Sequence, residues 1–78
     1  MIDEAIERLR DAGCPQPEKT VKELMDCGAL THYDLSKYVA LQMWRERLVK
    51  YPSKPPTMLL KDVAAVCRVS LNTLRRCL

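Results

Sequence analysis

The sequence predicts an all-α protein, a small bundle of about five helices that ends in a C-terminal helix-turn-helix. Apolar residues recur every three or four positions in successive stretches, which is the spacing of one helix face. Glycines and prolines fall between these stretches, where helices end and begin. With 78 residues, 47% of them apolar, the chain is expected to form one packed domain.

Two short helices are expected in the N-terminal part, over residues 2–12 and 17–26. Gly13 is placed to end the first helix, and Pro17 suits the first position of the second, where the missing N–H would have no partner. Gly28 can then end the second helix in a left-handed conformation. The apolar stripes of these helices consist of Ile2, Ala5, Ile6 and Leu9, and of Val21, Leu24 and Met25.

A longer third helix is expected from Thr31 to Lys50, with Asp34 in its first turn as a capping residue. Its apolar residues fall on two faces, so we expect one side to pack on the first two helices and the other on the terminal motif or on a second copy of the protein. A dimer would add stability that so small a core lacks. The alternative is that all these side chains are used within one monomer. The expected dimer or partner interface consists of Leu35, Tyr38, Val39, Trp44 and Leu48.

The chain therefore divides into a three-helix scaffold over residues 1–50, a proline-rich linker over residues 51–57 and a terminal motif over residues 58–78. The prolines prevent the third helix from continuing. Lys54 in the linker and Lys61 in the motif are candidates for DNA phosphate contacts. For basic residues in this region, the alternative is ordinary solubilising charge.

The terminal motif consists of two amphipathic segments that meet at an abrupt turn. In the first segment, Val63 and Cys67 lie about one helical turn apart on one face. Val69 supplies an apolar plug between the segments, and the side-chain oxygen of Ser70 is expected to cap the second by accepting a backbone N–H. The second segment has Leu74 and Cys77 on its inner face and Leu71, Asn72, Arg75 and Arg76 on its outer face.

The pattern Asp62-Val63-Ala64, Val69-Ser70, Thr73-Leu74 and Arg76 resembles the helix-turn-helix of lac-repressor-type regulators and of resolvase–invertase recombinases. The resemblance covers residues 60–78. It implies that the second helix enters the major groove of double-stranded DNA. Arg68 stands where that family commonly has a turn glycine, a replacement with a modest steric cost. The positions that the resemblance places against bases or phosphates are Ser70, Leu71, Asn72, Arg75 and Arg76.

Charge is distributed unevenly along the chain. Residues 1–34 contain four Lys or Arg and eight Asp or Glu, a net charge of −4, whereas residues 35–78 contain nine and two, a net charge of +7. A basic half that carries the terminal motif suits phosphate contact, because each neutralised phosphate releases counterions. Basic residues on solvated helix faces are the alternative explanation.

No catalytic, metal or cofactor site is expected. The cysteines form no C-x-x-C pair, and His32 has no cysteine at zinc-ligand spacing. Neither a glycine-rich phosphate loop nor a paired nucleophile and base is recognisable. With no apolar run near 18 residues and no signal-peptide pattern, we expect a cytoplasmic protein that does not bind membranes. The four cysteines are Cys14, Cys27, Cys67 and Cys77.

Two functions compete at this point. The first is a small, dimeric, sequence-specific DNA-binding transcriptional regulator of the kind that bacteriophages or plasmids encode. The second is a protein-binding module, such as an anti-activator, an inhibitor or an assembly subunit, that keeps the helix-turn-helix shape. The +7 half of the chain favours DNA. The early end of the last helix, with Leu71 and Leu78 exposed, favours a protein partner.

Overall fold

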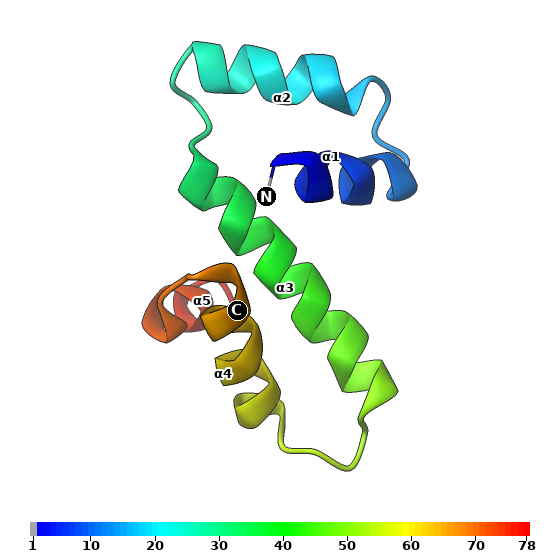
Figure 1. Cartoon of the computed structure of the whole chain (residues 1–78), viewed down its shortest axis with the longest axis vertical. Helices are drawn as coiled ribbons and strands as arrows, with labels where there is room; N and C mark the ends of the chain where they lie inside the picture. Colours follow the sequence, from blue (N-terminus) through cyan, green and yellow to red (C-terminus); the bar gives the residue numbers. More distant parts are fainter. Residues whose placement is uncertain (1) are drawn as a thin grey trace.

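The computed structural model describes residues 2–78 of the chain. Within these residues it contains five α-helices and no strand (Figure 1). The prediction of an all-α protein is confirmed at this level. The bounds of the helices are Ile2–Asp11 for α1, Pro17–Asp26 for α2, His32–Lys50 for α3, Pro56–Cys67 for α4 and Leu71–Arg76 for α5.

The long helix α3 is the centre of the arrangement. In Figure 1 it runs diagonally through the molecule, with α1 and α2 on one side of it and α4 and α5 on the other. It packs against α1, α4 and α5, and α2 packs against α1. The expectation that α3 carries apolar residues on two faces is met, because different helices cover its different sides.

The core is continuous from α1 to α5. Small side chains allow the helices to approach closely: Ala5 and Ala40 are completely buried, and Ala64 is 5% exposed. Larger apolar residues fill the remaining space, and burial of each such side chain contributes about 1.5–3 kcal/mol before the cost of ordering it is subtracted. The other buried members of this cluster are Val21, Leu35, Val39, Leu60, Val63, Cys67, Val69 and Leu74.

Local sequence signals explain where the first three helices begin and end. Pro17 is the first residue of α2, and Gly13 (φ +92°) and Gly28 (φ +81°) follow α1 and α2 in left-handed conformations. At the start of α3, the Asp34 N–H donates to Thr31 Oγ1 at 3.2 Å, and the Thr31 N–H donates to Asp34 Oδ2 at 2.9 Å. This capping box confirms the predicted start of the third helix.

The boundary of the fourth helix differs from the expectation. Helix α4 begins at Pro56 rather than at residue 58, so the connection after α3 comprises residues 51–55. Proline is favourable in the first turn of a helix, which is why Pro56 belongs to the helix and not to the linker. The indole N–H of Trp44 donates to the Pro56 carbonyl oxygen at 3.0 Å and ties this start to α3.

The expected interface on α3 is largely inside the chain. Leu35 and Val39 are 3% and 1% exposed in the monomer, so the prediction that they lie on an outer interface is wrong for these two residues. Tyr38 and Trp44 are half-buried against the same core, and Leu48 has intermediate exposure. The physical reason is that α1 and α4 pack against α3 within the monomer and bury these side chains.

Candidate nucleic-acid interface

The turn between α4 and α5 is built around Arg68. This residue stands where the resembled family commonly has a turn glycine, and it adopts the left-handed conformation (φ +55°, ψ +44°) that glycine favours. The turn is closed by two backbone bonds, from the Arg68 N–H to the Ala65 carbonyl at 3.4 Å and from the Val69 N–H to the Ala64 carbonyl at 3.0 Å. Val69 is 6% exposed and fills the space between the helices, as expected.

Helix α5 divides into a buried side and a polar side. Leu74 is completely buried and anchors the helix, whereas Asn72, Arg75 and Arg76 are exposed. Leu71 differs from the prediction: it is partly buried against the core instead of standing on the outer face. Because α5 packs against α3 as well as α4, two helices cover its apolar side and only the polar residues remain outside.

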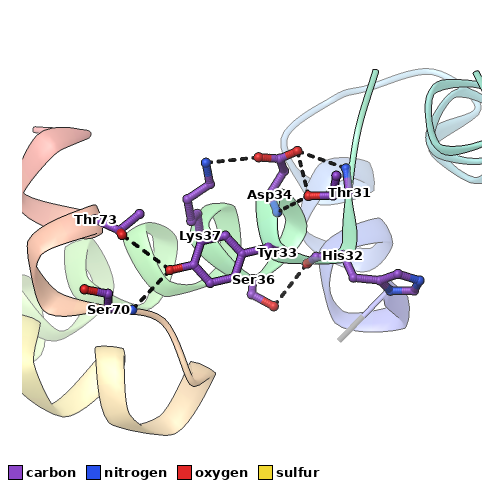
Figure 2. A network of polar contacts seen from close by, with 8 residues as sticks. All are labelled: Thr31, His32, Tyr33, Asp34, Ser36, Lys37, Ser70 and Thr73. Carbon is purple, nitrogen blue, oxygen red and sulfur yellow. Dashed lines mark hydrogen bonds and ion pairs between the residues drawn. The ribbon is translucent and has the colours of Figure 1, made fainter. Parts of the chain in front are cut away.

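Ser70 occupies the predicted N-cap position, but its side chain makes no capping hydrogen bond. Its backbone N–H instead donates to the hydroxyl of Tyr33 at 3.3 Å, and that hydroxyl donates to Thr73 Oγ1 at 3.4 Å. Figure 2 shows Tyr33 reaching from α3 to both residues of the α5 region. The start of α5 is therefore held by a tertiary contact rather than by its own cap.

Tyr33 and Lys37, one turn apart on α3, extend this polar region. The contacts with Thr73 and then with the Ser70 N–H lower the pKa of Tyr33 below its usual value. The ammonium of Lys37 lies 3.0 Å from Asp34 Oδ1, which raises the pKa of Lys37, and 5.8 Å from the centroid of the Tyr33 ring. Neither residue was a predicted site residue, because nothing in the sequence indicates that the first turns of α3 meet α5.

The charged side chains of the segment 63–78 are all basic. Residues 63–78 contain Arg68, Arg75 and Arg76 but no Asp or Glu, and all three arginines are exposed. None of them forms an ion pair with a carboxylate of residues 2–78. An unpaired, exposed guanidinium can donate to two acceptors at once, which suits phosphate groups and guanine edges.

The two predicted lysines lie at different places. Lys61 is exposed on α4, the helix that precedes the turn. Lys54 lies in the connection before α4, with its ammonium 4.7 Å from the centroid of the Tyr51 ring. The 12 residues of α4 span about 18 Å. The structure therefore brings residues 70–76 together and places Lys54 at the opposite end of α4.

No metal-binding group and no helix able to span a membrane are found among the described residues. His32 is exposed, and within residues 2–78 no group of three or more His, Cys, Asp or Glu side chains is arranged to hold a metal ion. None of the five helices is long and apolar enough to cross a membrane, as far as residues 2–78 are concerned. Burial raises the pKa of the Cys67 thiol, whose sulfur lies 3.7 Å from the sulfur of Met43.

Comparisons of the chain with protein-family models, with curated proteins and with solved structures find no match. We therefore infer the function of the chain from its own geometry and charge.

Proposed function

We propose that the protein is a small sequence-specific DNA-binding regulator that places α5 in the major groove. The observation that carries the proposal is the division of α5, in which Leu74 is completely buried while Asn72, Arg75 and Arg76 are exposed without a neighbouring carboxylate on the helix. A groove-reading helix needs this arrangement, because its buried side must fix it and its polar side must remain free.

Each exposed side chain has a base or phosphate that it suits. Asn72 can form a bidentate pair with adenine, and Arg75 or Arg76 with the O6 and N7 acceptors of guanine. Lys61, exposed on α4, is assigned to a phosphate. Leu71 is removed from the set of base contacts, because most of its side chain is used to pack α5 against the core.

The proposal includes a dimer on DNA. A six-residue helix reads few base pairs, so paired half-sites would supply the specificity that one copy lacks. The dimer surface differs from the one that the sequence predicts, because Leu35 and Val39 are already buried inside one chain.

The proposal is tested by selection from a pool of random duplex DNA at two salt concentrations, followed by sequencing of the retained fraction. A two-fold-related motif, with affinity that falls steeply as salt rises, is expected. The double variant Arg75→Ala/Arg76→Ala should lose specific binding and keep its helicity. The matched control Lys19→Ala/Lys22→Ala removes the same charge from exposed positions of α2 and should bind normally. Unselective retention, or equal loss in both variants, would refute the groove assignment.

A protein-binding module is the second candidate, and exposed apolar residues favour it. Val66 on α4 is 60% exposed and Leu78 after α5 is 59% exposed, so both leave apolar surface in water near the turn. If the selection retains no motif, the variants Val66→Ser and Leu78→Ser would be compared with the wild-type chain for self-association and for capture of partner proteins. Unchanged behaviour of both variants would contradict this function.

A further inference from the structure

A cavity lies at the end of α4 opposite to α5. The last turns of α3, the connection 51–55 and the first turns of α4 surround it, with Arg8 of α1 at one side, and its volume is about 420 Å³. That volume falls within the range of small-molecule sites in proteins. Its basic lining residues are Arg8, Arg47, Lys50 and Lys54, and its acidic ones are Glu46 and Asp62.

The charges that line this cavity do not cancel. The Arg8 guanidinium pairs with Glu46 and, at 2.7 Å, with Glu4, so Arg8 and Glu46 neutralise each other. No carboxylate of residues 2–78 lies within ion-pair distance of the remaining cations, Arg47, Lys50 and Lys54. Three positive groups and the carboxylate of Asp62 leave a net charge of +2 in the cavity.

Two of these cations lie close to the aromatic ring of Tyr51. The Lys54 and Lys50 ammonium groups lie 4.7 Å and 5.4 Å from the centroid of its ring. Two like charges near one ring repel each other, and a bound anion would reduce that repulsion. The partial negative charge at the end of α3 offsets the charge of Lys50, but Lys54 lies beyond that helix.

Two apolar side chains form part of the lining of the cavity. Leu59 is 2% exposed and Met43 packs against the core, and both line the cavity. Cationic groups beside apolar and aromatic side chains suit a ligand that has an anionic group and a flat apolar body.

We propose that this cavity binds a phosphate group, either of a free nucleotide or of a nucleic-acid backbone. A phosphate monoester carries about −1.5 to −2 charges at pH 7, which matches the net charge of the site better than a single carboxylate does. The base of a nucleotide would lie against the Tyr51 side of the cavity. The site does not rest on the proposed function, because Arg75 and Arg76 lie at the other end of α4.

The test is an amide NMR titration of the full chain at low salt with adenosine 5′-monophosphate, and separately with adenosine. The monophosphate should shift the amides of Tyr51, Lys54 and Leu59 in a saturable manner, whereas adenosine should bind at least tenfold more weakly. The variant Lys50→Gln/Lys54→Gln should weaken binding of the monophosphate at least tenfold. The control Lys19→Gln/Lys22→Gln, on exposed positions of α2, should not.

The outcomes separate the phosphate sources and the two proposals. If the monophosphate binds saturably and the Arg75→Ala/Arg76→Ala variant binds it equally well, the result supports a site for a free nucleotide. This conclusion is independent of whether α5 binds the major groove. If the monophosphate does not bind but Lys50→Gln/Lys54→Gln selectively weakens binding of random-sequence duplex DNA, the phosphate belongs to a nucleic-acid backbone. The proposal would be overturned if adenosine bound as tightly as the monophosphate, or if the Lys50→Gln/Lys54→Gln variant and its control lost binding equally. It would also be overturned if Lys50→Gln/Lys54→Gln changed the binding of neither the monophosphate nor the DNA.

Discussion

The hydroxyl of Tyr33 lies 3.3 Å from the backbone nitrogen of Ser70 and joins α3 to the start of α5 across 37 positions of sequence. The same hydroxyl contacts Thr73 Oγ1 at 3.4 Å, so a single side chain fixes both the turn and the first part of α5 (Figure 2). Since α5 has six residues, it cannot hold its position by its own helical stability. Its orientation depends on the burial of Leu74 in the core and on the hydrogen bonds of Tyr33.

Replacing Tyr33 by phenylalanine removes the hydroxyl and keeps the ring. The loss of these hydrogen bonds should lower the free energy of unfolding slightly and speed amide exchange at Ser70, whose N–H loses its acceptor. The control is Tyr38→Phe, because the Tyr38 hydroxyl has no hydrogen bond within residues 2–78. Equal exchange rates at Ser70 in the two variants would show that Tyr33 does not position α5.

The features that the sequence predicts well are local ones. The capping box of Thr31 and Asp34 spans three residues, and Pro17 marks the start of α2 by its own ring geometry. The features that the sequence predicts wrongly depend on contacts between segments that are distant in the sequence. Leu71 turns inward because α3 and α4 together cover α5, and the Ser70 side chain does not cap where Tyr33 supplies the contact. No periodicity within one segment contains that information.

The candidate site follows the same division. The polar side of α5, with Asn72, Arg75 and Arg76, could be identified because helical spacing around Leu74 defines it. Lys54 is a predicted phosphate contact because it flanks the terminal motif, although the 12 residues of α4, about 18 Å of helix, lie between it and α5. The basic cavity was missed because its residues come from α1, α3, α4 and the connection 51–55, which are brought together only in the folded chain.

Arg68 holds a left-handed conformation without the freedom of glycine. Replacing Arg68 by glycine should therefore raise the free energy of unfolding by about 0.5–1 kcal/mol, since relief of the steric cost outweighs the greater entropy of the unfolded chain. The variant Arg68→Ala controls for the lost charge, because alanine keeps the steric cost. Chemical denaturation of the three proteins measures the difference. A glycine variant no more stable than the alanine variant would contradict the expected strain.

The pKa of Asp34 provides a pH-dependent test of the start of α3. The Thr31 N–H and then the Lys37 ammonium stabilise its carboxylate and lower the pKa from 3.8 to about 2. Because the folded pKa is the lower one, the stability contributed by this group is complete above pH 4 and is lost as pH falls from about 4 to 2. Carboxyl NMR titration should give a midpoint near 2, and Lys37→Gln should raise it while leaving it below 3.8. A wild-type midpoint at the usual value would exclude the capping box in solution.

Leu74 and Leu78 form a matched pair for testing how α5 is anchored. Leu74 is completely buried, whereas Leu78 is 59% exposed. Leu74→Ala should lower the free energy of unfolding by about 2–5 kcal/mol, whereas Leu78→Ala should change it by less than about 0.5 kcal/mol. Since Leu74 anchors α5 from its buried side, its truncation should also displace the polar side of α5 and abolish specific DNA binding. Denaturation and DNA binding would be measured on both variants. A Leu74→Ala protein that remains folded and binds the selected motif with wild-type affinity would show that the orientation of α5 does not determine recognition.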